Sequence, residues 1–128
     1  MKYENKKRNV IGITMGDPCG IGPEVVLKAL TSQRIRNEAD YVIIGSERIL
    51  RDVAENLTLK VKIHSHHRNS GFSKMVEGVS DGINVLDLGN VSGWDTFSRK
   101  PLPECGSASV EYIQEAISLV MGKRIDAM

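Results

Sequence analysis

The chain has 128 residues and a formal net charge of +1, which suits one domain with a core of modest size. It has no basic stripe, and no apolar run approaches the roughly 20 residues that cross a bilayer, so we expect neither nucleic acid nor membrane as a partner. Residues 1–9 are polar and lack the apolar segment of a signal peptide. We therefore expect a polar N-terminal extension, residues 1–9, ahead of a cytoplasmic domain, residues 10–128.

Two basic clusters and two cysteines stand out in the composition. We interpret Lys6-Lys7-Arg8 as a solvated chain end and Lys123-Arg124 as the polar end of a helix. Cys19 and Cys105 lie far apart in the sequence and lack the spacing of metal ligands. Because a cytoplasmic protein is kept reduced, we expect two separate thiols and no disulfide.

The first elements read as a strand, a turn and a helix. Val10–Thr14 is an apolar run typical of a buried strand, and residues 15–22 are rich in Gly and Pro, which predicts a turn. Pro23 suits the first position of a helix, which should fade at residues 31–33. The apolar face of this helix comprises Val25, Val26, Ala29 and Leu30.

A second strand and helix follow. Tyr41–Ile44 is apolar and ends at Gly45, and Ser46 is a good N-cap with Glu47 in the first helical turn. The residues with helical spacing are Ile49, Leu50, Val53, Ala54 and Leu57. Residues 59–63 alternate apolar and charged side chains, which predicts a third, more exposed strand. This β-α-β-α-β order predicts an α/β fold with a largely parallel sheet flanked by helices.

The second half is less regular until its last helix. We expect residues 65–82 to form an excursion with little core, residues 83–88 a strand, and residues 89–106 a long loop. The last helix should start at a cap on Gly106 or Ser107 and end at Gly122. Its apolar stripe comprises Val110, Ile113, Ala116, Ile117, Val120 and Met121. Residues 125–128 resemble the approach to a further strand, so we expect exposed apolar surface on this helix and at that sheet edge.

The residues with the strongest functional signal form the loop Met15–Glu24 (M-G-D-P-C-G-I-G-P-E), between a strand end and a helix start. Ligands bind at that edge of an open parallel sheet, where glycines allow close backbone approach and the helix offers free N–H groups. The carboxylates of Asp17 and Glu24 suit hydroxyls, a cationic ring or basic groups. The loop matches neither common glycine-rich nucleotide motif. A rigid turn with capping carboxylates is the alternative interpretation.

The order of residues in this loop carries a family resemblance. Ile13–Glu24 (I-T-M-G-D-P-C-G-I-G-P-E) resembles the opening motif of the 4-hydroxythreonine-4-phosphate dehydrogenase (PdxA) family, with Cys19 in place of a small residue. Residues 106–116 resemble a helix of the same family. Isocitrate and isopropylmalate dehydrogenases have a similar opening and share the fold, but the Pro18-Cys19 insertion argues against an isopropylmalate-type enzyme. The resemblance implies a partial isocitrate/isopropylmalate-dehydrogenase-like fold, truncated before its second half.

The resemblance also implies an activity. The family comprises homodimeric NAD(P)-dependent oxidoreductases that act on a CH–OH group of 4-hydroxythreonine 4-phosphate or a related phosphorylated hydroxy acid, in pyridoxal phosphate (pyridoxine) biosynthesis or sugar-acid catabolism. A divalent metal (Zn, Mg or Co) polarises the alcohol. The family's metal-binding histidines and main substrate-phosphate residues lie past Met128, so the resemblance assigns no catalytic residue and no metal ligand here. The expected cofactor-binding residues are Gly16, Asp17, Gly20, Gly22 and Glu24.

We expect the isolated chain to be an inactive fragment; the alternative is a non-catalytic nucleotide-binding or subunit-interaction module. We interpret His64, His66 and His67 as an exposed loop cluster and not as metal ligands, because no cluster of carboxylates or cysteines accompanies them. Cys19 lies near a helix start but lacks a neighbouring base, so we do not expect a nucleophile. We interpret Trp94 and Phe97 as local packing residues and Asp95 and Arg99 as surface residues. Ser107 and Ser109 are expected at the start of the last helix.

Overall fold

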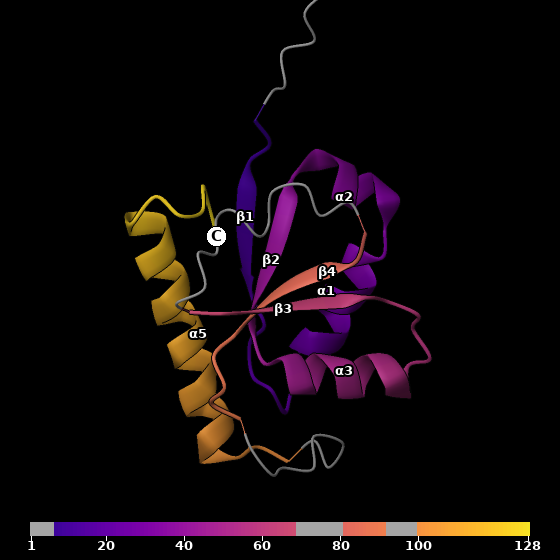
Figure 1. Cartoon of the computed structure of the whole chain (residues 1–128). Helices are drawn as coiled ribbons and strands as arrows, with labels where there is room; N and C mark the ends of the chain where they lie inside the picture. The colour runs from indigo at the N-terminus through magenta and orange to yellow at the C-terminus, as the bar shows by residue number, and fades with distance from the viewer. Residues whose placement is uncertain (1–6, 69–80, 92–99) are drawn as a thin grey trace, which may run out of the picture.

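The computed structural model describes residues 7–68, 81–91 and 100–128. Within them, a four-stranded parallel sheet has the order β1-β2-β4-β3. Figure 1 shows helix α5 on one side of the strands and helices α1 and α3 on the other. The predicted α/β fold with a parallel sheet between helices is confirmed. Its strands are β1 (Val10–Thr14), β2 (Asp40–Gly45), β3 (Ile63–His67) and β4 (Ile83–Asp87).

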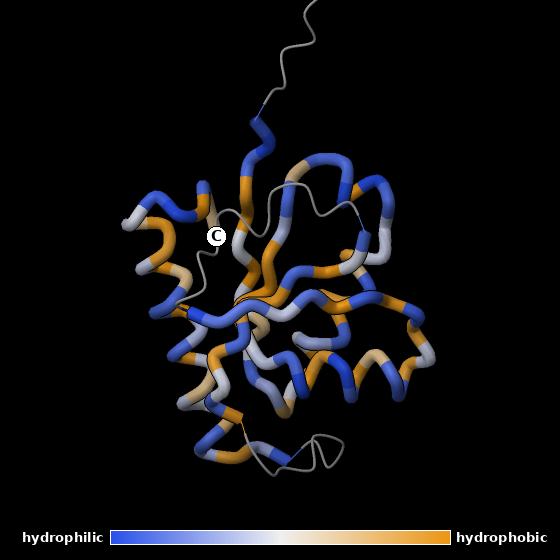
Figure 2. The backbone as a smooth tube through the Cα atoms, in the orientation of Figure 1, coloured by the Kyte–Doolittle hydropathy of each residue, from blue (hydrophilic) through white to orange (hydrophobic). Residues whose placement is uncertain are grey.

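The centre of the sheet forms the core. Val42, Ile43 and Ile44 of β2 are fully buried in succession, as are Val85 and Leu86 of β4. Successive strand residues point to opposite faces, so burial of consecutive residues means that helices cover both faces. Figure 2 shows these central strands as apolar segments inside a more polar outer chain.

Three helices precede β3. They are α1 (Gly22–Leu30), α2 (Gln33–Glu38) and α3 (Glu47–Asn56). The predicted N-cap of α3 is confirmed, since the Ser46 hydroxyl accepts a hydrogen bond from the Ile49 amide at 3.4 Å. Two details of α1 differ from expectation: Pro23 is its second residue, and Val25 is exposed while Leu27 is buried. The short α2, where the sequence only indicated a fading helix, buries none of its side chains.

The third strand lies later in the sequence than predicted. Residues 59–62 precede the strand, and β3 begins at Ile63, so the histidine segment belongs to the sheet. The alternation at residues 59–63 misled because Leu59 and Val61 pack against the core from outside the strand. The predicted excursion at residues 65–82 is thus wrong for residues 65–67; residues 69–80 lie outside the described part.

Helix α5 (Pro103–Met121) begins three residues before the expected cap, with Leu102 at the N-cap and Pro103 in the first turn. Its end before Gly122 agrees with the prediction. The predicted stripe is wrong in part, because the helix buries a different face: Cys105, Ala108, Tyr112, Ala116 and Leu119. Small side chains at positions 108 and 116 let α5 approach the sheet, which leaves Val110, Ile113, Ile117 and Met121 exposed.

The C-terminal residues of the chain meet the edge strand β1. The Gly12 amide donates to the Ala127 carbonyl at 2.9 Å, and the Val10 amide donates to the Asp126 carboxylate at 2.7 Å. The predicted approach to a further strand is confirmed as an isolated parallel bridge between Ile11 and Ala127. This contact covers part of the sheet edge that was expected to be exposed. Among the described residues, no helix combines the length and apolarity needed to cross a bilayer.

Candidate functional site

The Met15–Glu24 loop leaves the carboxyl end of β1 and enters α1, as the sequence predicts. The Met15 amide donates to the Ile44 carbonyl at 3.0 Å, which continues the β1–β2 pairing for one more residue. Gly16 then has φ +78°, a left-handed conformation that favours glycine. The chain therefore turns sharply at the sheet edge instead of running on past it.

Close packing around Met15 depends on two glycines, one at the start of α1 and one at the end of β2. A Cβ built at Gly22 would collide with the Met15 carbonyl oxygen, and one built at Gly45 would collide with the Met15 side chain. Met15 is almost fully buried between these positions. The start of α1 is thus held against the end of β1 by backbone contact, which fixes where its first N–H groups point.

The two acidic residues of the loop have different surroundings. Asp17 is exposed, and its Oδ1 accepts the Cys19 amide at 2.8 Å while its carbonyl accepts the Gly20 amide at 2.9 Å. Glu24 forms an ion pair with Lys28 one turn later on α1, at 2.7 Å. Asp17 therefore stabilises the turn itself, while the N-cap residue of α1, Ile21, makes no side-chain capping bond.

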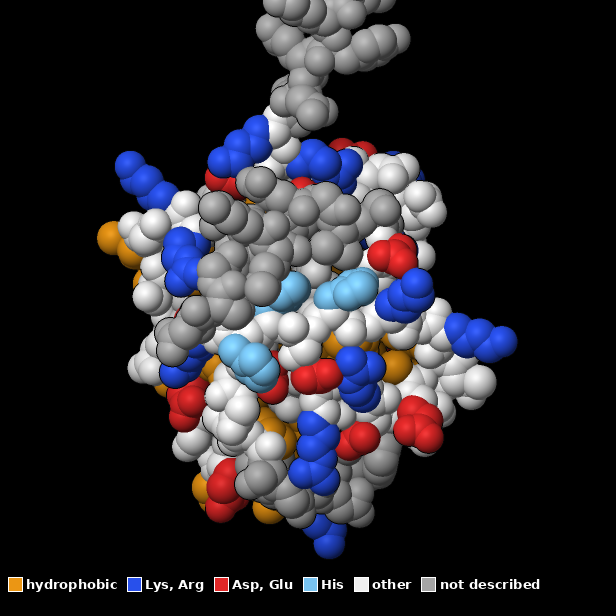
Figure 3. Space-filling model, in the orientation of Figure 1, with side chains coloured by type: hydrophobic (Ala, Val, Ile, Leu, Met, Phe, Trp, Pro, Cys, Tyr) orange, Lys and Arg blue, Asp and Glu red, His pale blue; other side chains and the backbone are white. Residues whose placement is uncertain are grey.

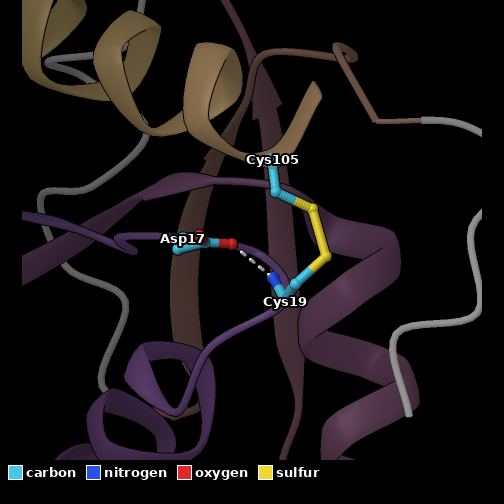
Figure 4. The surroundings of a disulfide bond; sticks show 3 residues. All are labelled: Asp17, Cys19 and Cys105. Carbon is cyan, nitrogen blue, oxygen red and sulfur yellow. Dashed lines mark hydrogen bonds between the residues drawn. A yellow bond between two sulfur atoms is a disulfide. The ribbon is translucent and has the colours of Figure 1, made fainter. Parts of the chain in front are cut away.

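The loop is bonded covalently to a distant segment. Cys19 and Cys105 form a disulfide with their Cα atoms 6.2 Å apart, although they are 86 positions apart in the sequence (Figure 4). The expectation of two separate thiols is therefore wrong. Sequence spacing gave no signal, because the pair meets only when α5 packs across the end of β1. The two sulfurs and a carboxylate oxygen of Asp17 lie within 4.8 Å of one another.

Polar groups from neighbouring strand ends lie along the same edge. Asp87 at the end of β4 accepts the amides of Glu47, at 3.3 Å, and Gly89, at 3.2 Å. The Tyr112 hydroxyl of α5 donates to the Asn90 side chain at 3.1 Å. Burial, with the Asp87 and Glu111 carboxylates nearby, raises the pKa of Tyr112 above its ordinary range. The neutral phenol thus connects α5 to the segment after β4.

The histidines do not converge on one point. His64 contacts the Asp81 carbonyl at 2.9 Å, and the buried His66 contacts the Asn84 side chain at 3.1 Å, each through Nε2. His67, at the strand end, is exposed. Figure 3 shows the histidine side chains near one another in the middle of one face of the molecule. In the described ranges, the three do not belong to any group with metal-binding geometry. The expectation of an exposed cluster is wrong for His66, because β3 places its side chain inside the fold.

The remaining sequence candidates lie in α5 or outside the described residues. Ser107 is exposed and Ser109 half-buried, both inside α5 and beyond its N-cap. Residues Trp94, Asp95, Phe97 and Arg99 lie outside the described part of the chain.

A cavity of about 300 Å³ lies at the opposite, amino edge of the sheet. Arg8, Asp40 and Tyr41 line it near the starts of β1 and β2, and Gly82 and Asn84 line it beside β4. The Arg8 guanidinium there already donates to the Asp40 carboxylate and to three backbone carbonyls. Because Arg8 and Asp40 are engaged in the fold, we take the carboxyl edge as the candidate site, where the loop, the helix start and the disulfide meet.

Two known proteins have sequences similar to most of this chain. A Fusobacterium nucleatum protein named for D-threonate 4-phosphate dehydrogenase activity is 35% identical over 94% of this chain, which covers 35% of that protein. A 4-hydroxythreonine-4-phosphate dehydrogenase of Desulforapulum autotrophicum is 29% identical over 94% of the chain, and 34% of it is covered. The chain matches an N-terminal portion of the 4-hydroxythreonine-4-phosphate dehydrogenase family. The resemblance seen in the loop is thereby confirmed.

A solved structure gives the same result for the fold. A 4-hydroxythreonine-4-phosphate dehydrogenase from Burkholderia phymatum superposes with a TM-score of 0.82 and 27% identity, covering 94% of this chain and 35% of that one. No family model matches the sequence. The chain thus spans about a third of the length of the family members that it matches.

Proposed function

We propose that this chain is part of an NAD(P)-dependent dehydrogenase that oxidises a CH–OH group of a small phosphorylated hydroxy acid. Two substrates are suggested by the names of its relatives, 4-hydroxythreonine 4-phosphate and D-threonate 4-phosphate. The complete enzyme is proposed to be a cytoplasmic homodimer. The chain's own part in this activity is the loop at the carboxyl edge.

The observation that carries the proposal is the geometry of that loop. Gly16 turns the backbone at the end of β1, and Gly22 brings the start of α1 against it. Free N–H groups at a helix start favour an anionic group such as a dinucleotide phosphate. We assign cofactor contact to this turn, and its carboxylates suit hydroxyl groups. The residues are Gly16, Asp17, Gly20, Gly22 and Glu24. NAD(P)+, when bound, accepts the hydride.

The described residues do not fit the divalent metal of the family. His64, His66 and His67 do not converge, and the cluster of Asp17, Cys19 and Cys105 has its two sulfurs in a disulfide. A hard cation that polarises an alcohol needs several free oxygen or nitrogen ligands in one place. We therefore derive no metal-dependent step from these residues, and we propose that the 128-residue chain alone does not turn over substrate.

The first experiment measures nucleotide binding and turnover separately. Thermal shift with NAD+ and NADP+ should show stabilisation of the wild-type chain, reduced in Asp17→Asn. Glu55→Gln, an exposed carboxylate on α3, is the matched control and should bind as the wild type does. Absence of a shift with either nucleotide contradicts cofactor contact. Formation of reduced nicotinamide with Mg²⁺ or Zn²⁺ and 4-hydroxythreonine 4-phosphate contradicts the proposed inactivity.

A second candidate function is a subunit-interaction module. The exposed apolar face of α5 supports it, since contiguous apolar surface marks association sites. Its members are Val110, Ile113, Ile117 and Met121. Sedimentation should show concentration-dependent association that Ile117→Lys reduces and that Lys7→Glu leaves unchanged. A monomer at all concentrations contradicts self-association through this face.

A further inference from the structure

We propose that Cys19 and Cys105 are a reversible thiol–disulfide site whose oxidation state decides whether the Met15–Glu24 loop is fixed to α5. The proposal concerns the loop named under the proposed function but depends on no bound nucleotide. Cys19 lies between β1 and α1, and Cys105 lies in the first turn of α5 (Figure 4).

The backbone places the two sulfurs for reversible bonding. A Cα separation of 6.2 Å lies within the usual range of disulfides, so the fold brings the two cysteines within bonding reach. Cys105 is fully buried and Cys19 is 6% exposed. In the reduced protein, each thiol would be the other's nearest reaction partner, which favours an intramolecular bond over linkage between molecules.

The bond is also the main attachment of the first turn of α5. Pro103, Glu104, Gly106 and Ser107 are all exposed, so Cys105 is the buried residue that holds this turn to the body. The N-cap residue Leu102 makes no side-chain capping bond. Loss of the disulfide therefore leaves the turn with few buried contacts, and segments with few such contacts open locally at low free energy.

On the other side, the same bond attaches the tip of the loop to α5. Its tip is exposed at Asp17, Gly20 and Ile21, and Pro18 and Cys19 are the buried residues between them. The hydrogen bond from the Cys19 amide to Asp17 lies within the loop and does not tie it to α5. The disulfide thus connects α5 to the loop that leads into α1, and these two helices lie on opposite sides of the sheet (Figure 1).

The redox step requires a small disulfide, such as glutathione disulfide, as the oxidant. One protein thiolate attacks it and releases one small thiolate, giving a mixed disulfide. The second protein thiolate then attacks the protein sulfur of that mixed disulfide and releases the second small thiolate. Two protein thiols become one disulfide, one small disulfide becomes two small thiols, and the protons pass between them through solvent. Excess small thiol reverses the sequence.

The test uses the full 128-residue chain without nucleotide. Protein is equilibrated with reduced and oxidised glutathione at graded ratios, quenched in acid, and alkylated in denaturant. Mass spectrometry should show a cooperative change from two modified cysteines to none. Hydrogen exchange on the reduced chain should be on the order of tenfold faster than on the oxidised chain at residues 16–22 and 103–107, and unchanged in β2 and β4.

Cys19→Ala and Cys105→Ala are the matched variants. With or without oxidant, the amide hydrogens of each variant should exchange as fast as those of the reduced wild type. Circular dichroism should show that the sheet is retained. Equal exchange of the oxidised and reduced wild type overturns the proposal, as does a pair that stays dithiol in excess glutathione disulfide. Zn²⁺ binding that blocks oxidation of the reduced pair also overturns it, since the pair is then a metal site. A failed nucleotide titration leaves these measurements intact.

Discussion

The two ends of the parallel sheet are stabilised in different ways. At the amino edge, Arg8 donates to the Asp40 carboxylate at 2.9 Å and to the carbonyls of Arg36 and Ala39 at 2.6 and 2.7 Å. At the carboxyl edge, the chain relies on glycine-dependent backbone contact and a disulfide. The amino edge thus uses its charged group for structure, while the carboxyl edge leaves the helix start open. This difference is the reason that we propose the carboxyl edge as the ligand-facing end.

The largest expected effect comes from closing the space at Gly22. Gly22→Ala places a Cβ against the Met15 carbonyl oxygen, so the loop or the helix must move. We expect a loss of about 4 kcal/mol in the free energy of unfolding. Gly106→Ala is the control, because nothing lies near its added Cβ and alanine favours a helix. Chemical denaturation measures both, and equal stabilities would refute the close-contact explanation.

Reduction of the disulfide should have the next largest effect. The bond closes a loop across a sequence separation of 86 residues, so breaking it gives the unfolded chain more freedom. The expected loss is about 3 kcal/mol, the middle of the range for native disulfides. Calorimetry with and without reductant measures it. Cys105→Ala should show no dependence on reductant, and a dependence there would point to another cause.

At the amino edge, Arg8→Ala should cost less. The side chain is 44% exposed, so its ion pair with Asp40 contributes little, and the loss comes mainly from hydrogen bonds to carbonyls. We expect about 1–2 kcal/mol less stability and no change in nucleotide-induced shift. Lys7→Ala, at an exposed neighbour, should be neutral. A loss of nucleotide binding in Arg8→Ala would move the candidate site to this edge.

The smallest effect concerns Tyr112 and alkaline pH. Because its pKa is raised in the folded state, the unfolded chain ionises first, near pH 10. Stability from this group is complete below that pH and falls as pH rises further, by at most about 1.4 kcal/mol per pH unit. Tyr112→Phe should therefore lose stability less steeply above pH 10 in denaturation series. Parallel curves for the two proteins would contradict the shift.

The sequence predicted the elements with clear local signals. The apolar run at Val10–Thr14 and the Ser46 cap of α3 lie where expected, because both depend on nearby residues. It misplaced β3 and the buried face of α5, since several apolar residues compete for burial there and only packing selects among them. For the candidate site, the sequence indicated the loop but gave no signal of its partner Cys105.

The sequence by itself determined the parallel α/β architecture and the glycine-rich turn, because hydrophobic periodicity and the conformational needs of a tight turn are local properties. Only the tertiary structure decided that Cys19 meets Cys105 and that Arg8 is engaged in the fold. Both are contacts between segments far apart in the chain. Their geometry follows from how α1 and α5 pack on the sheet, which no spacing along the sequence encodes.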